Sequence, residues 1–173
     1  MLLNINNKIN ISLCGMMGSG KSAIGKSLAN KLDYNFIDVD KMIEIDAKKT
    51  IKKTFEEDGE EYFRNLEEKI TINILRNKKT IVSLGGGAII NKKIRNSIKK
   101  NSYNIYLNVD LDTLIKRLRN SKTRPLIYKK NLKKELINLI KFREKFYRKA
   151  DLIIKNETNI IETTQNILKK IIN

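Results

Sequence analysis

Cysteine, proline and long apolar runs are scarce in this 173-residue sequence. Its one cysteine, Cys14, has no partner for an internal disulfide, and its place in an apolar segment favours a buried, inert thiol in a reducing compartment. No apolar run approaches the roughly 20 residues that cross a bilayer. The segment Met1–Asn10 also lacks the charged stretch followed by an apolar one that marks a secretory signal. We therefore expect a cytoplasmic protein with no membrane partner.

Linkers and internal repeats are absent as well. Pro125 is the only proline, and no stretch is rich in proline, glycine or serine. Hydrophobic residues make up 40% of the chain, which is typical of a globular protein and sufficient for one buried core at this length. The sequence therefore predicts a single domain over residues 1–173.

Acidic residues are few relative to basic ones, 19 against 36, which gives a formal net charge of +17. A nucleotide-dependent nucleic-acid-binding module would carry such a charge as a basic stripe with interleaved aromatic side chains. Aromatic residues make up only 6% of this chain, and its lysines are spread over every predicted helix. Lysine, isoleucine and asparagine are all abundant and share AT-rich codons, so compositional bias explains the charge. We expect no specific nucleic-acid partner, although a positive field attracts anionic substrates.

Short apolar segments alternate with amphipathic ones along the chain. The apolar segments are typical of strands buried on both faces and cover residues 9–14, 35–38, 80–84, 103–108 and 152–155. Helices are predicted over residues 21–32, 59–76, 92–99, 111–119, 133–148 and 160–172. This alternation predicts an α/β fold of three layers, a five-stranded parallel sheet with helices on both faces, which binds ligands at the carboxyl ends of its strands.

A phosphate-binding loop follows the first predicted strand. Residues 15–22, Gly-Met-Met-Gly-Ser-Gly-Lys-Ser, fit the pattern G-x-x-x-x-G-K-[ST] between a strand and a helix. The glycines permit positive φ, and successive N–H groups then face the phosphates. Lys21 is expected to reach the β- and γ-phosphates, and Ser22 to bind Mg²⁺. The alternative is a glycine-rich turn with a solvated lysine, which the pattern and its context disfavour.

Two aspartates close the second predicted strand, in the segment Phe36-Ile37-Asp38-Val39-Asp40. Because side chains alternate along a strand, Asp38 and Asp40 are expected to point to the same side. Two carboxylates beside a phosphate loop suit a hydrated Mg²⁺ and a substrate hydroxyl. Alternatively, they cap a helix that begins near Met42. The phosphate loop upstream favours the functional interpretation.

Further motifs follow in order along the chain. They are Gly59-Glu60-Glu61-Tyr62-Phe63-Arg64-Asn65-Leu66-Glu67, Gly85-Gly86-Gly87, Arg124-Pro125-Leu126-Ile127, and Arg143 with Tyr147 and Ala150-Asp151. Together with the phosphate loop and the two aspartates, this ordered set resembles the shikimate kinase family from about residue 8 to residue 172. The resemblance implies the nucleoside-monophosphate-kinase type of P-loop fold and the transfer of phosphate from ATP to the 3-hydroxyl of shikimate. We expect the chain to act as a monomer.

On the nucleotide side, the resemblance implies one Mg²⁺ held by Ser22 and, through water, by Asp38. Arg117 would pack on the adenine, and a lid over residues 120–132 would carry Arg124 to the phosphates. The residues that the resemblance assigns to ATP binding are Gly18, Ser19, Gly20, Lys21, Ser22, Ala23, Arg117 and Arg124.

On the acceptor side, the resemblance implies a substrate-binding subdomain over about residues 40–68. Asp40 would take the hydroxyls of shikimate, and Arg64 and Arg143 would take its carboxylate, with Gly85, Gly86 and Gly87 beside it. A hydroxylated acid does need a hydrogen-bond acceptor and a guanidinium fork. Catalysis would rest on alignment and charge stabilisation, carried by Lys21, Asp40 and Arg124.

Structural alternatives stay open for several of these residues. Arg64 could be a solvated helix residue paired with Glu60, Glu67 or Glu68, and Arg143 could pair with Glu144. The three glycines could form a flexible turn, and Arg124 could be a solvated surface residue. Lys116 and Arg119 lie close enough to Arg117 to be confused with it.

Two positions depart from the family pattern. Ala23 replaces a common threonine, with little consequence because Ser22 keeps the hydroxyl for the metal. Lys48 replaces a common glycine and is expected to alter a turn in the substrate-binding subdomain. Among enzymes, the alternative is another small-molecule kinase, for gluconate or a nucleoside monophosphate, and the pair Arg64 and Arg143 with the triple glycine argues against it.

Overall fold

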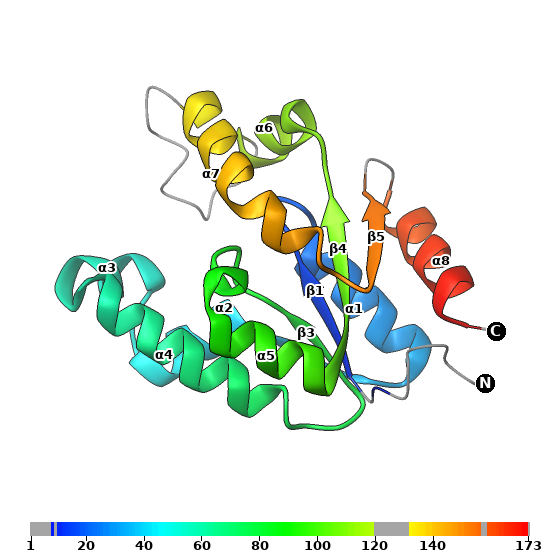
Figure 1. The fold of residues 1–173 in the computed structure, drawn as a ribbon, viewed down its shortest axis with the longest axis horizontal. Helices are drawn as coiled ribbons and strands as arrows, with labels where there is room; N and C mark the ends of the chain where they lie inside the picture. The colour runs from blue at the N-terminus through cyan, green and yellow to red at the C-terminus, as the bar shows by residue number, and fades with distance from the viewer. Residues whose placement is uncertain (1–7, 9, 120–131, 157–158, 173) are drawn as a thin grey trace.

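Five parallel strands form one sheet within the residues that the computed structural model describes, which are 8, 10–119, 132–156 and 159–172 (Figure 1). The strands are β1 (Asn10–Cys14), β2 (Asn35–Asp38), β3 (Thr80–Ser83), β4 (Ser102–Asn108) and β5 (Leu152–Lys155). Their order is β2-β3-β1-β4-β5. Because β1 lies in the middle with β3 on one side and β4 on the other, the loop after β1 sits where the strand order reverses, the usual ligand position in such sheets.

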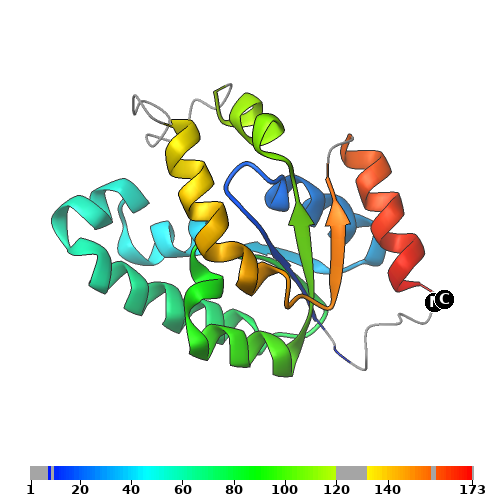
Figure 2. The same cartoon turned by 45° about the horizontal axis from the view of Figure 1, so that its top comes forward.

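Helices cover both faces of this sheet, as Figure 2 shows. One face is covered by α1 (Lys21–Leu32) and α8 (Ile160–Ile171), which contact each other. The opposite face carries α4 (Gly59–Ile74), α5 (Lys92–Asn101) and α7 (Leu132–Tyr147), with α6 (Leu111–Arg119) against α7. The predicted three-layer α/β fold is confirmed, and most predicted elements agree with the observed ones to within two residues at each end.

Each face of the sheet has its own apolar core because strand side chains alternate. Ile11 and Leu13 of β1 pack with residues of α1 and α8, whereas Cys14 belongs to the core beneath α5 and α7. Cys14 is buried, as predicted, and burial raises the pKa of its thiol to about 12. The thiol therefore stays protonated and unreactive at neutral pH.

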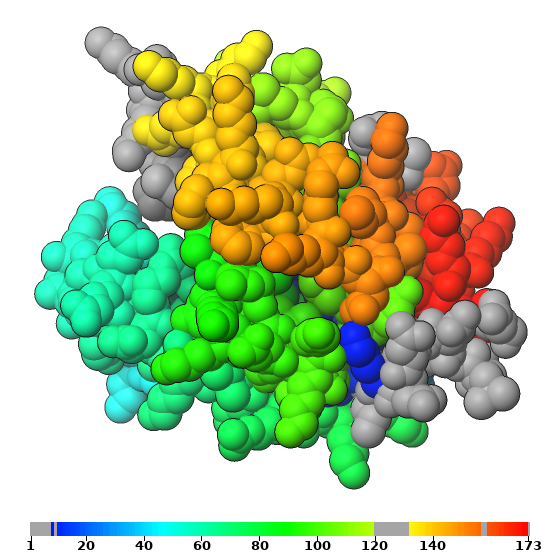
Figure 3. Space-filling view, viewed as in Figure 1, coloured from blue at the N-terminus to red at the C-terminus, as the bar shows by residue number. Residues whose placement is uncertain are grey.

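A lobe of three helices extends from the sheet beyond β2. It consists of α2 (Val39–Ala47), α3 (Ile51–Glu57) and α4, and Figure 3 shows α3 and the start of α4 projecting at the edge of the molecule. Helix α3 was not predicted, and its only fully buried side chain is Thr54. A helix of seven residues with so small an apolar face has no clear periodicity. It is held in place by the contact of Phe55 with Phe63 of α4, whose ring centroids lie 4.5 Å apart with the rings tilted by 35°.

The second strand ends at Asp38, as predicted, and Val39 and Asp40 lie in the first turn of α2. The expectation that Asp38 and Asp40 point to the same side of a strand was therefore wrong, because Asp40 is helical. Asp38 is the N-cap of α2, and its Oδ1 accepts a hydrogen bond from the backbone N–H of Asp40 at 3.2 Å.

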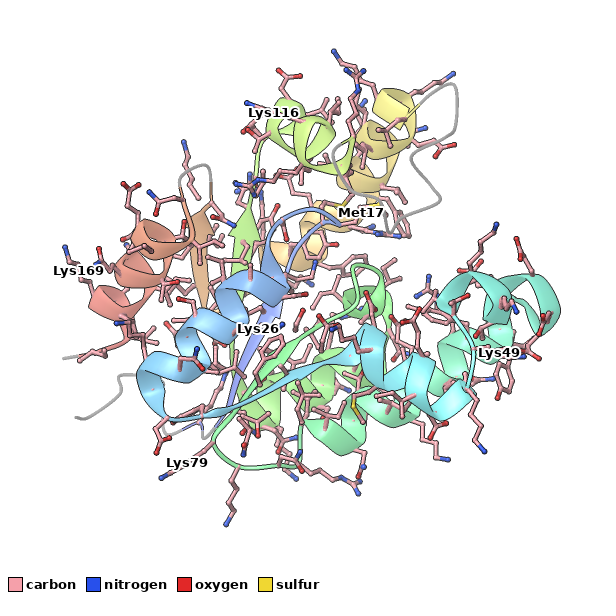
Figure 4. All side chains as sticks on the ribbon, turned by 180° about the vertical axis from the view of Figure 1, so that it is seen from behind. Met17, Lys26, Lys49, Lys79, Lys116 and Lys169 are labelled. Carbon is pink, nitrogen blue, oxygen red and sulfur yellow. The ribbon has the colours of Figure 1, made fainter. Side chains whose placement is uncertain are left out.

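The surface is rich in lysine on all sides. The labelled lysines of Figure 4 lie on α1, α6, α8, the α2–α3 turn and the turn before β3. Within the described ranges, no helix is long and apolar enough to cross a bilayer.

Lys48 occupies a position that favours glycine. It is the C-cap of α2 with φ 54° and ψ 26°, in the left-handed region. In that region the Cβ of an L-residue crowds the following carbonyl oxygen, and helices most often end there with glycine. The departure noted in the sequence thus leaves the turn intact but strained.

We predict that Lys48→Gly raises the free energy of unfolding by about 1 kcal/mol, because the strain is relieved and the exposed lysine side chain has no hydrogen bond or ion pair to lose within the described residues. Urea denaturation followed by circular dichroism measures this. The matched control is Lys69→Gly, an exposed residue inside α4, which should lower the stability by about 1 kcal/mol. Destabilisation by both changes would contradict the assignment.

Candidate active site

The phosphate loop has the backbone conformation that its glycines predict. Gly15, Gly18 and Gly20 have φ values of 143°, 79° and 89°, which only glycine adopts readily. The ammonium of Lys21 folds back over the loop and donates to the carbonyl oxygens of Gly15 at 2.9 Å and Met16 at 3.0 Å. The loop therefore presents a cation and the N-terminus of α1 to the same space, an arrangement that suits a phosphate.

Ser22 and Asp38 meet at the edge of this loop. The Ser22 hydroxyl donates to Asp38 Oδ2 at 2.5 Å, while Asp38 Oδ1 caps α2. The helix-capping interpretation of Asp38 is therefore confirmed, and the metal-binding interpretation stays a prediction. A hydroxyl and a carboxylate are hard oxygen donors, and two such donors beside phosphates suit a divalent ion that keeps most of its water. Ala23 follows in α1 and contributes its backbone to the first turn.

The triple-glycine turn follows β3 and lies against charged side chains of α2 and α4. A Cβ on Gly85 would lie 2.6 Å from Glu67 Oε1 and 2.8 Å from Asp40 Oδ1. A Cβ on Gly87 would lie 2.9 Å from Arg64 Nη1. All three distances are shorter than a real Cβ shows, so a side chain at Gly85 or Gly87 would displace these charged groups. The glycines therefore leave room for the charged groups beside the turn.

Gly86 joins the two halves of the site. A Cβ there would lie 3.6 Å from the backbone nitrogen of Met17 in the phosphate loop and 3.6 Å from Arg143 Nη1. Its carbonyl oxygen accepts hydrogen bonds from Tyr147 Oη at 2.5 Å and from Arg143 Nη1 at 3.3 Å. The turn thus contacts the phosphate loop on one side and the charged cluster on the other.

Arg64 forms ion pairs with Glu60 and Glu67, two of the three glutamates that the sequence offered as partners. Its Nη1 lies 2.6 Å from Glu67 Oε2, and its Nε lies 3.3 Å from Glu60 Oε1. The two partners differ in exposure, because the Glu67 side chain is 2% exposed and the Glu60 side chain 69%. The buried pair with Glu67 therefore fixes the position of the guanidinium, whereas the exposed pair with Glu60 is weak and can be replaced by a ligand.

Arg143 does not pair with Glu144, which instead contacts Arg148 at 2.7 Å. Arg143 is 9% exposed, and its buried Nε has no hydrogen-bond partner within the described residues. Tyr147, one turn later in α7, stacks on Tyr106 with ring centroids 5.0 Å apart, and burial raises the pKa of its hydroxyl. The hydroxyl therefore remains a proton donor to Gly86 at all working pH values.

On the far side of the phosphate loop lies Arg117 of α6, whose Nη2 donates to the carbonyl oxygen of Asn156 at 2.9 Å. It is Arg117, and not Lys116 or Arg119, that is bound to the loop after β5. Arg124 and the expected lid fall in 120–131, outside the described residues, and Leu132 begins α7.

Three residues at this site were not assigned from the sequence: Glu67, Tyr147 and Asn156. Glu67 and Tyr147 stood in the quoted motifs, and the spacing of Arg64 and Glu67 on one helix face was visible, but nothing in the sequence showed that Glu67 is buried. Asn156 gave no signal, because its partners lie in four segments far apart in the chain.

A family model, related sequences and solved structures all indicate the same family for this chain. The family model described as shikimate kinase matches residues 17–173. A shikimate kinase of Bartonella henselae is 39% identical over 172 residues, 99% of this chain and 81% of that protein. The solved shikimate kinase of Acinetobacter baumannii in complex with shikimate has a TM-score of 0.90 and 32% identity over 95% of this chain and 93% of that one. A gluconokinase from Sinorhizobium meliloti shares the fold alone, with a TM-score of 0.60 and 15% identity over 92% and 89% of the chains.

The buried carboxyl of Glu67 makes stability depend on pH. Burial raises its pKa above the ordinary 4.5; Arg64 opposes this shift, Asp40 adds to it and Arg143 lowers it. Since the folded protein holds this proton more tightly than the unfolded chain, the contribution of Glu67 to stability is present below pH 4.5 and is lost as the pH rises through the folded pKa.

We therefore predict that Glu67→Gln becomes progressively more stable relative to the unmodified protein as the pH rises through that window. Urea denaturation from about pH 4 to about pH 8 measures the two free energies of unfolding. Glu61→Gln, an exposed change on the same helix, is the matched control. A difference for Glu67→Gln that is constant, or that shrinks with rising pH, would contradict the prediction.

Proposed function

The chain belongs to the shikimate kinase family, and on this premise we propose that it transfers the γ-phosphate of ATP to the 3-hydroxyl of shikimate. The observation that carries the proposal is the position of Gly86, in contact with both the phosphate loop and Arg143. A donor phosphate on the loop and an acceptor beside the turn would then be neighbours. We further propose that residues 1–173 act as one domain and as a monomer in the cytoplasm.

The acceptor half is suited to a hydroxylated carboxylic acid. Asp40 presents a carboxylate oxygen beside Gly85 and can accept hydrogen bonds from hydroxyls. Arg64 and Arg143 supply guanidinium groups for the carboxylate, with Glu60 giving up its exposed pair with Arg64. Glu67 would hold Arg64 in place throughout, since its own ion pair is buried. We propose the subdomain over about residues 40–68 as the part that binds the acceptor.

The nucleotide half requires a divalent metal ion, as an ATP-dependent kinase does, and we propose Mg²⁺. Ser22 and Asp38 would hold it, Asp38 through water, and the ion would neutralise charge on the β- and γ-phosphates. Lys21 and the backbone of Gly18, Ser19, Gly20 and Ala23 would bind the phosphates, and Arg117 would pack on the adenine.

Catalysis in this proposal rests on alignment. Asp40 would orient the attacking hydroxyl and accept its proton, while Lys21 stabilises negative charge on the transferring group. Arg124, carried by a lid over residues 120–132, would add a second cation and help exclude water, so that ATP is not hydrolysed.

The first test is acceptor choice. With MgATP, a coupled assay of ADP release should show turnover with shikimate well above that with gluconate or a nucleoside monophosphate. The physical reason is that only shikimate offers both a carboxylate for the two guanidinium groups and hydroxyls for Asp40. Equal or faster turnover with either alternative acceptor would refute the assignment.

The second test addresses Asp40. Asp40→Asn should lower kcat by about 10²-fold or more, because the amide cannot accept the proton of the attacking hydroxyl. Binding of ADP, measured by isothermal titration calorimetry, should be retained because the phosphate loop is intact. Asp46→Asn, an exposed change on the same helix, is the matched control and should leave kcat unchanged. A kcat for Asp40→Asn close to that of the control would remove Asp40 from the catalytic role.

A further inference from the structure

Asn156, the residue directly after β5, is a buried junction of four segments. It is 3% exposed, and each of its four polar atoms forms a hydrogen bond. Its Nδ2 donates to the carbonyl oxygen of Ser19 at 2.6 Å, and its Oδ1 accepts from Thr163 Oγ1 at 2.8 Å. Its backbone N–H donates to Asn108 at 2.8 Å, and its carbonyl oxygen accepts from Arg117 at 2.9 Å. The phosphate loop, β4, α6 and α8 are thereby tied to one residue.

The bond to Ser19 orients a peptide group of the phosphate loop. In a trans peptide the carbonyl of one residue and the N–H of the next point in opposite directions. With the Ser19 carbonyl held by Asn156, the N–H of Gly20 points away from Asn156, to the other side of the loop. Gly20 fits closely here, since a Cβ on it would lie 2.8 Å from Asn156 Nδ2. The side chain of Asn156 thus orients the N–H of Gly20, one of the backbone groups that would bind a phosphate.

The backbone of Asn156 holds the cation beside the same loop. Arg117 Nη2 is bound to its carbonyl oxygen, whereas Arg117 Nη1 is buried and has no hydrogen-bond partner in the described part of the chain. This free nitrogen would lie 3.9 Å from a Cβ on Gly20. A buried guanidinium nitrogen without a partner is costly, which indicates that it is positioned for a ligand.

We propose that Asn156 is a positioning residue that aligns the phosphate loop with Arg117 and so sets the affinity for the nucleotide, with Thr163 fixing the orientation of its amide. The inference rests on the proposed function only in taking the loop as a nucleotide site. Among the described residues, the acceptor half of the site, formed by α2, α4, α7 and the glycine turn, shares no hydrogen bond with Asn156. The effect is therefore confined to one of the two substrates.

Two near-isosteric variants test the side chain without removing its volume. Asn156→Asp replaces the donor that faces the Ser19 carbonyl with an acceptor, and Thr163→Val removes the hydroxyl that orients the amide. ADP dissociation constants, measured by isothermal titration calorimetry, should rise by about tenfold in each, the equivalent of one hydrogen bond. The KM for ATP should rise likewise, with the KM for the acceptor unchanged.

The matched control is Asn10→Ala at the opposite end of β1. Asn10 is 2% exposed, and its side chain bonds to Leu75, Asn77 and Thr80, so its removal should lower the melting temperature and leave ADP binding unchanged. The proposal is overturned if both variants bind ADP like the unmodified protein, or if Asn10→Ala weakens ADP binding as much as they do. Because ADP binding needs no acceptor, a wrong acceptor assignment would leave this result intact.

Discussion

Charged side chains of α2 and α4 lie so close to Gly85 and Gly87 that a Cβ at either position would displace them, and the acceptor half of the site depends on this close approach. The carboxylates of Asp40 and Glu67 and the guanidinium of Arg64 occupy the space where Cβ atoms would lie. Since β3 and β1 are adjacent in the sheet, the turn after β3 must also meet the loop after β1. Elements that are distant in sequence are thus brought to one point by the order of parallel strands.

The charged groups gathered there stabilise each other only in part. Asp40 and Glu67 provide two carboxylates, and Arg64 and Arg143 two guanidinium groups, so the cluster is balanced in formal charge. Balance does not remove the desolvation cost of a nearly buried carboxyl, which is why the pKa of Glu67 is raised in spite of its ion pair with Arg64. A cluster of this kind adds little to stability. The cluster instead positions Arg64. Glu67 binds Nη1 of its guanidinium in a buried pair, and Glu60 binds Nε in a weak, exposed pair that a ligand can replace.

The sequence was sufficient for the parts of the molecule that are set by local chemistry. Strand and helix periodicity predicted the sheet and most helices, and the phosphate loop pattern predicted positive φ at Gly15, Gly18 and Gly20. It failed where the outcome depends on tertiary contacts. α3 has too small an apolar face to show a period. Asp40 lies in α2, which Asp38 caps, and the pattern of alternating residues cannot reveal that change from strand to helix. The role of Asn156 could not be predicted for the same reason. In the sequence, an asparagine in a polar loop gives the same pattern whether its polar atoms face water or are all hydrogen-bonded to the protein.

The distribution of charge also separates the two halves of the site. Residues 40–68 contain ten acidic and six basic residues and so carry a net charge of −4. Since the whole chain carries +17, the residues outside this range carry a net charge of +21. A nucleotide with its several phosphate charges is attracted to the sheet and its loops by this field. The α2–α4 lobe offers no such general attraction to an anion. Selection of a carboxylate there must therefore come from the local geometry of Arg64 and Arg143, at contact distance, where a planar guanidinium distinguishes a carboxylate from other anions and a diffuse field cannot.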